Sequence, residues 1–314
     1  MRKKQSYKTI NWPEYNKKKV NEGDVRLFFT DDVISAWYAP HAGNKHRPQI
    51  YADTAIELAL IIRARFCRDL RTTNGYLRAM MKTMGFNVST PDYSTVCRRM
   101  ASLSVDFKVK ARGREAIDLA IDSTGLKVYG RGEWKTKPSD RFNVKNWKMM
   151  HLGMHAKDFQ IEDVELTTCK VGDGQVGERM INRMNGKLGK VYGDKAYASK
   201  DCFNAIERKG GTAIIDLPSN IKLAPDKRLQ ANPGLIQRNR TILAEKIHGK
   251  TKWKERSGYH QRSKIECQMN RFKRTFGEAL ASRKHCNQDT EVMIKVLILN
   301  IYANLGMPHT VNVT

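Results

Sequence analysis

Four residues near the C-terminus, Tyr259, Arg262, Glu266 and Lys273, have types and spacings that could do chemistry on a charged substrate. At about 100° per residue they fall within roughly 60° of one another on a helix, so the sequence predicts one polar stripe along a single helix. The chain has a net charge of +25. A carboxylate among cations in such a chain indicates a metal-assisted site that acts on a polyanion.

The same helix has an apolar side that can pack against the rest of the protein. This side is a second stripe, about 90° away around the axis, and it consists of Ile265, Met269, Phe272 and Phe276. The helix can therefore bury its apolar side and hold the polar stripe along a cleft.

Two further acids follow apolar segments that are typical of strands. Asp122 ends the alternating run EAIDLAID, and Asp194 ends LGKVYGD. Carboxylates that a fold brings together repel one another unless a cation compensates them. Oxygen ligands suit Mg²⁺ or Mn²⁺ rather than Zn²⁺. Two such ions, about 3.5–4 Å apart, can activate an attacking oxygen and stabilise a leaving one at phosphorus.

Each acid also has a purely structural interpretation. Asp122 could cap or turn the chain, and Asp118 on the same strand face is a rival for its role. Asp194 could be a turn residue, and Glu266 with Arg262 could form an ordinary surface pair worth a few tenths of a kcal/mol. The acids gain weight only when they are considered together.

Considered together, the three segments resemble a known family. The pattern of Tyr259, Arg262, Glu266 and Lys273 resembles the C-terminal signature of DDE transposases from bacterial insertion sequences. The segment IDSTGLKVYG is similar to that family's first-acid motif, and VYGDKAYAS is similar to its second. The resemblance is closest to the insertion-sequence-five family, and it extends from about residue 50 to the end.

This resemblance implies an α+β or α/β protein whose catalytic domain is RNase H-like, with a mixed sheet flanked by helices, preceded by a helical N-terminal DNA-binding region. It implies that Asp122, Asp194 and Glu266 are catalytic and hold two Mg²⁺ ions, for which Mn²⁺ can substitute. The expected activity is cleavage at the ends of an insertion sequence and joining of the freed 3′-OH ends to target DNA. Two alternatives are an RNase H-fold nuclease without strand transfer and a non-catalytic, transposase-derived DNA-binding protein.

The implied partner is double-stranded DNA, at the transposon ends and at the target, and the protein is expected to act as a homo-oligomer on bacterial nucleoid DNA in the cytoplasm. Arg262 and Lys273 can hold phosphates, and Tyr259 can stack or form a hydrogen bond near the cut strand. Trp253 can stack on an extruded base or simply pack locally. Arg98 and Arg99 would lie on the second helix of a helix-turn-helix-like pair at 72–102.

Charge and patterning suggest the domain organisation. Residues 208–274 hold 17 Lys or Arg against 5 acids, and the first twenty residues are also strongly basic. Two basic clusters around an acidic site favour a nucleic-acid surface. We expect a basic arm at 1–23, a helical DNA-binding domain at 24–112, and a catalytic domain at 113–314 with a weakly patterned insertion at about 218–257.

The coarse element prediction follows from periodicity and caps. Helices are expected at 30–38, 50–67, from Thr72 or Thr73 to Met84, 91–102, 174–185, 199–210 and 287–305. Strands are expected at 117–122, 124–128, 147–156, 161–168, 188–194 and 212–218. The six scattered cysteines indicate reduced thiols, and no apolar run is long enough to span a membrane.

Overall fold

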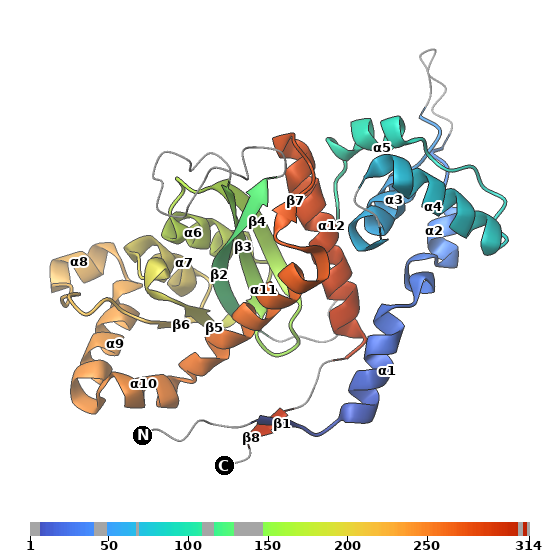
Figure 1. Ribbon diagram of the computed structural model, residues 1–314. Coiled ribbons are helices and arrows are strands. Elements are labelled where there is room, and N and C mark those ends of the chain that lie inside the picture. Colours follow the sequence, from blue (N-terminus) through green and yellow to red (C-terminus); the bar gives the residue numbers. More distant parts are fainter. Residues whose placement is uncertain are drawn as a thin grey trace, which may run out of the picture. The chain divides into compact units, whose positions relative to one another are not determined.

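Alternating apolar residues in the middle of the chain form a mixed sheet of six strands in the computed structural model (Figure 1). The structure describes residues 7–40, 49–66, 69–108, 116–128, 147–306 and 310–312. The strands are β2 (Ile117–Val128), β3 (Trp147–His155), β4 (Ile161–Thr168), β5 (Leu188–Gly193), β6 (Thr212–Ile215) and β7 (Ala279–Leu280). Their order is β4-β3-β2-β5-β6, and β7 pairs with β2.

The direction of the strands changes at β2. The pairs β2–β3 and β3–β4 are antiparallel, whereas β2–β5, β5–β6 and β2–β7 are parallel. Three antiparallel strands followed by parallel ones, with helices on the faces, are consistent with the predicted RNase H-like α+β fold, which is confirmed.

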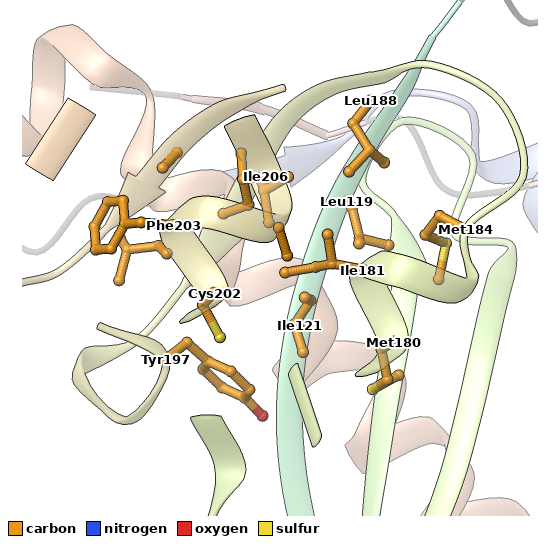
Figure 2. Packing of buried hydrophobic residues seen from close by; sticks show 14 of the residues in the cluster. Leu119, Ile121, Met180, Ile181, Met184, Leu188, Tyr197, Cys202, Phe203 and Ile206 are labelled. Carbon is orange, nitrogen blue, oxygen red and sulfur yellow. The ribbon is translucent and has the colours of Figure 1, made fainter. Parts of the chain in front are cut away.

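Helices cover both faces of this sheet. Leu119 and Ile121 of β2 point into a core formed with α6 (Asp173–Arg183) and α7 (Lys200–Arg208), as Figure 2 shows. The residues that alternate with them, Ala120 and Asp122, belong to the opposite face because side chains alternate along a strand. Helix α11 (Ser263–Phe276) packs against β2. Its apolar stripe behaves as predicted, since Ile265, Met269 and Phe272 are buried.

Contacts divide the chain into two units. Unit 1 takes Met1–Phe107 and Met293–Thr314, and unit 2 takes Lys108–Val292 with the six-stranded sheet. The boundary after residue 107 falls near the predicted one at 112, but the last residues belong to unit 1. The reason is α12 (His285–Asn304), whose later turns carry buried residues of unit 1 such as Ile298 and Tyr302.

Unit 1 is mostly helical. Its elements are β1 (Tyr7–Thr9), α1 (Trp12–Glu22), η1 (Val25–Phe28), α2 (Asp31–Ser35), α3 (Asp53–Phe66), α4 (Leu70–Thr83), α5 (Tyr93–Met100) and β8 (Thr310–Asn312). In its described part, the basic arm expected at 1–23 contains α1, a helix in which Lys18 and Lys19 pair with Glu22. Residues 1–6 of the arm lie outside the described residues. Strand β1 pairs with β8.

Two sequence-based predictions about elements need correction. The strands expected at 117–122 and 124–128 are one strand, β2, so Asp122 lies inside a strand rather than at its end. Gly125 lies within this strand, and a Cβ atom there would lie 3.0 Å from the ring of Trp147, so the glycine makes room for a close aromatic contact. The predicted cap of α4 at Thr72 or Thr73 is also wrong, since Asp69 accepts the hydrogen bond from the Thr72 amide at 2.8 Å.

The expected insertion at 218–257 is helical rather than weakly structured. It contains α8 (Asp226–Ala231), α9 (Leu235–His248) and α10 (Lys250–Ser257). Its pattern is hard to detect because polar residues on α9 bind backbone groups: Gln237 accepts a hydrogen bond from the Ala213 amide of β6 at 2.7 Å, and Asn239 accepts one from the Ala224 amide at 3.0 Å.

The five cysteines that the structure describes, Cys97, Cys169, Cys202, Cys267 and Cys286, are free. In the parts of the chain that the structure describes, no helix is long and apolar enough to cross a membrane.

Candidate active site

Strand register brings Asp122 and Asp194 to neighbouring positions. In the parallel pair, Leu119 lies opposite Val191 and Ala120 lies opposite Tyr192. Two residues further along each strand are Asp122 and Asp194. Asp194 directly follows β5 and caps η3 (Lys195–Tyr197), where its Oδ1 accepts a hydrogen bond from the Ala196 amide at 2.9 Å. The two carboxylates therefore project from adjacent strands at the same level of the sheet.

Arg262 joins the first and third acids across a long stretch of sequence. Its Nη1 donates to Asp122 Oδ2 at 3.1 Å, and its Nη2 donates to Glu266 Oε1. Glu266 lies in the first turn of α11, and Arg262 ends η4 (Tyr259–Arg262), the 3₁₀ turn that precedes it. The predicted single helix is thus a 3₁₀ turn followed by an α-helix, yet Arg262 and Glu266 still face the same site.

The electrostatics of Asp122 show that the three acids act on one another. Burial raises the pKa of the Asp122 carboxyl above its usual range, and the charges of Asp194 and Glu266 raise it further. The Ser123 amide, which donates to Asp122 Oδ1 at 2.8 Å, and the Arg262 guanidinium oppose this shift. A partly buried carboxylate with two others within electrostatic reach is a place where a cation is stabilising.

Arg262 supplies such a cation in the structure. Burial by itself would lower the pKa of the guanidinium, but its contacts with Glu266, Tyr259 and Asp122 raise that pKa above the usual value. Arg262 and Asp122 are both mostly buried, with side-chain exposures of 19% and 18%, whereas the Glu266 side chain is 49% exposed. The outer carboxylate is therefore open to solvent, and the inner one is held by Arg262.

Tyr259 lies beside Arg262 and contacts Trp253 and Lys254. Its ring centroid lies 5.8 Å from that of Trp253 and 4.6 Å from the Lys254 ammonium. Burial raises the pKa of the Tyr259 phenol to about 12, with contributions from Asp216 and Asp194. The phenol therefore stays protonated near neutral pH and remains a hydrogen-bond donor.

The structure separates the other predicted DNA contacts into two kinds. Lys273 is partly exposed on α11, seven residues after Glu266, and Arg98 is exposed on α5. In contrast, Arg99 donates to the backbone oxygen of Tyr51 at 2.8 Å and pairs with Asp53. Trp253 is buried against Tyr259, which is the local-packing alternative for this residue. Arg98 and Lys273 are thus the more accessible of these side chains.

The connection between α4 and α5 bears on the helix-turn-helix expectation. Residues 84–92 link the two helices, a longer segment than the three- or four-residue turn of the DNA-binding motif. Asn74 of α4 donates to the backbone oxygen of Pro91 at 2.7 Å, which fixes this segment to the first helix. A DNA-reading role for this pair of helices stays a prediction.

A further acid, Asp216, lies at this end of the sheet and was not among the candidates expected from the sequence. Asp216 follows β6 as Asp194 follows β5, and the Asp216 amide donates to the backbone oxygen of Gly193 at 3.2 Å. The signal was present, because TAIID is an apolar strand with a terminal carboxylate. Asp216 differs from the other acids because Lys250 and Lys254 of α10 both contact it.

The donor set fits hard divalent cations. Asp122, Asp194 and Glu266 offer only carboxylate oxygens, which Mg²⁺ and Mn²⁺ prefer, and burial together with the charges of Asp194 and Glu266 raises the pKa of Asp122. Among the described residues, no three Asp, Glu, His or Cys side chains lie close enough together to form a preformed metal site. Arg262 stands between two of the three carboxylates, so ion binding requires it to move.

Two family models match this chain, and both are described as a transposase DDE domain. One matches residues 20–131, and the other matches residues 114–301, which is more than half of the chain. The longer match contains all three acids and the basic residues around them.

Proposed function

This chain belongs to the DDE transposases, which are metal-dependent enzymes that act on DNA, and we propose that it moves an insertion sequence. In this proposal the protein binds the ends of the element, cleaves a phosphodiester bond there and joins the freed 3′-OH to target DNA. The observation that carries the proposal is the Arg262 bridge, because it joins Asp122 to a glutamate 144 positions later, beside Asp194 on the neighbouring strand.

The proposed catalytic residues are Asp122, Asp194 and Glu266. Their carboxylates would hold two divalent ions, Mg²⁺ or in its place Mn²⁺. Such ions, when bound, activate an attacking oxygen and stabilise the leaving oxygen in an in-line displacement at phosphorus. Glu266 can adjust its position as the site fills, because its side chain is the most exposed of those in the Arg262 bridge.

The remaining residues of the site position the DNA. Arg262 presents a planar fork of N–H donors that suits a phosphate as well as a carboxylate. In the proposed cycle it turns from the acids to a phosphate of the cut strand. The protonated Tyr259 phenol donates to the same strand, and Lys273 supplies a point charge further along α11. Positioning and charge compensation of this kind are what phosphoryl transfer requires from a protein.

Unit 1 is proposed to bind the ends of the element, with Arg98 on the exposed surface of α5 as a phosphate or base contact. Synapsis of two ends would need at least two copies of the chain on DNA. The net charge of +25 supports association with DNA, since Lys and Arg residues release counterions when they neutralise phosphates.

Substitution of each acid tests the proposal. Asp122→Asn, Asp194→Asn and Glu266→Gln should each abolish strand cleavage in Mg²⁺, because an amide cannot replace a carboxylate as an ion ligand. The measurement is a gel assay on a duplex that carries the terminal sequence flanking this gene. Binding of the same duplex, measured without divalent metal, should stay close to that of the unaltered protein.

The outcomes separate the candidate functions. Retained cleavage in any one of the three variants would remove that residue from the active site. Cleavage without joining of a labelled 3′ end to a plasmid would indicate a nuclease. End binding with no cleavage in Mg²⁺ or Mn²⁺ would indicate a DNA-binding protein that has lost catalysis.

A further inference from the structure

The parallel strands β5 and β6 are each followed directly by an acid, Asp194 and Asp216, but these two acids are compensated differently. Asp216 lies beside Asp194, since Gly193 of β5 pairs with Ile215 of β6. Asp216 is buried, with only 6% of its surface exposed. Two ammonium groups hold it: Lys250 Nζ lies 2.5 Å from Oδ1, and Lys254 Nζ lies 3.0 Å from Oδ2.

One cation would be enough to neutralise this carboxylate. Asp216 has two lysines beside it, and both are partly open to solvent, with side-chain exposures of 39% and 35%. Glu245 of α9 is a second acid within electrostatic reach of both lysines. Burial by itself would raise the pKa of Asp216, but the hydrogen bonds from Lys250 and Lys254 hold that pKa below its usual range. The aspartate therefore stays charged and keeps both ammonium groups in place.

Short helix α10 fixes the direction of the two lysines. Lys250, Trp253 and Lys254 have the i, i+3, i+4 spacing that places side chains on one face of a helix. Trp253 is buried on this face, and Lys250 also donates to the backbone oxygen of Leu217 at 3.0 Å. The face is thus anchored at the end of β6, while Lys252 on another face of the helix is exposed.

The lysines adjoin the proposed active site through Tyr259. Lys254 Nζ lies 4.6 Å from the Tyr259 ring centroid, and Arg262 contacts Asp122 and Glu266. The row Lys250, Lys254, Tyr259 and Arg262 therefore leads from the end of β6 to the three acids. All of these residues belong to unit 2.

We propose that Lys250 and Lys254, positioned by Asp216, form a binding site for a DNA backbone phosphate beside the acids, on the Asp194 side. This inference rests on the proposed function, because it takes the three acids as the place where DNA is cut. An ammonium has three N–H donors. Lys254 gives one to Asp216, and Lys250 gives one to Leu217 and faces Asp216, so each lysine keeps at least one donor for a phosphate. Lys254 and Tyr259 together would hold the strand next to the scissile bond.

The salt dependence of DNA binding tests this site directly. The logarithm of the association constant falls with the logarithm of salt concentration, with a slope of about −0.9 for each phosphate contact to B-form DNA. Lys250→Gln and Lys254→Gln should each reduce the steepness of this slope by about 0.9. Lys252→Gln is the matched control, because it removes the same charge from another face of α10 and should change the slope much less.

Two further measurements locate the phosphate and separate a contact from a structural role. The first uses duplexes that each carry one neutral methylphosphonate near the cleavage point. One of these substitutions should weaken binding by the unaltered protein but not by Lys254→Gln. Substitutions at the other positions should weaken binding by both proteins equally. Lys254→Arg, which keeps the charge, should restore most of the slope. Melting temperatures identify any variant that fails to fold.

The inference would be overturned if Lys250→Gln and Lys254→Gln kept the original slope, or if Lys252→Gln reduced it equally. Strictly additive effects of Lys254→Gln and every methylphosphonate would also overturn it. Binding is measured without divalent metal and on a duplex of arbitrary sequence as well as on the end duplex. Failure of cleavage or of end preference would therefore count against the proposed function and not against the lysine site.

Discussion

At the scale of single residues, Arg262 is the centre of this site. In the absence of a metal ion its guanidinium compensates Asp122 and Glu266, two acids that repel each other and Asp194. The ions proposed for this site would need the same carboxylate oxygens. Ion binding and the Arg262 contacts therefore compete, and ion binding would free the guanidinium for DNA.

This competition predicts opposite effects of Arg262→Gln with and without metal. Without metal, the variant should be less stable than the unaltered protein by about 1–3 kcal/mol, because charged hydrogen bonds to a partly buried carboxylate are lost. Added Mn²⁺ should raise its melting temperature more than that of the unaltered protein, since the ion no longer displaces a cation. Thermal melting without DNA measures both effects.

Arg274→Gln provides the control, because Arg274 is exposed near the end of the same helix. It should behave like the unaltered protein in both conditions. Equal Mn²⁺-induced shifts in all three proteins would show that Arg262 does not compete with the ion.

At the scale of elements, the position of Asp194 depends on how η3 packs against α6. Tyr197 of η3 is buried in the core of unit 2, where Figure 2 shows its ring near Cys202. Gly177 of α6 allows this approach: a Cβ atom there would lie 2.6 Å from Tyr197 Cδ1. Since Asp194 caps η3, the glycine indirectly helps to hold an acid of the site.

Gly177→Ala should therefore destabilise the protein by roughly 1–3 kcal/mol, the usual cost of overpacking a core. The better helix propensity of alanine offsets only part of this cost. Chemical denaturation measures the change, and cleavage should fall as η3 shifts. Gly75→Ala in α4 is the contrast, because a Cβ atom there meets nothing within 4 Å, and it should stabilise the chain slightly. A stabilised Gly177→Ala protein would contradict the packing described here.

Local patterns predicted the elements near the acids well, but not the contacts between them. The apolar stripe from Ile265 to Phe276 gave α11, and the caps Thr30 and Ser199 are observed. The strand at 117–128 was divided in two, and nothing in the sequence reveals that a Trp147 ring packs against Gly125 of this strand. The helices at 226–257 were missed because residues such as Gln237 turn polar groups inward to satisfy backbone groups.

The candidate acids were predictable from three motifs, whereas their surroundings were not. The Arg262–Asp122 bond joins residues 140 positions apart, and its formation depends on the register of β2 and β5 and on the packing of α11. The Asp216–Lys254 bond spans 38 positions and escaped attention for the same reason. Only the folded structure shows which acids pair with a Lys or Arg side chain and which could bind a metal ion.

At the scale of the whole molecule, the net charge is strongly positive, whereas the fold brings three acids together. A chain with a net charge of +25 gathers carboxylates from β2, from the end of β5 and from α11 at one place in unit 2. The positive charges of a strongly basic protein repel one another. Bound DNA would reduce this repulsion, and its phosphates would then lie close to the acids. The proposed catalysis therefore requires divalent ions between the carboxylates and the DNA phosphates.

Anomalous X-ray scattering from crystals grown with Mn²⁺ tests this claim most directly. The account predicts Mn²⁺ peaks within coordination distance of the carboxylates of Asp122, Asp194 and Glu266, with Arg262 turned away from Asp122. Peaks at other residues, with these three carboxylates uncoordinated and Arg262 still bridging two of them, would contradict it.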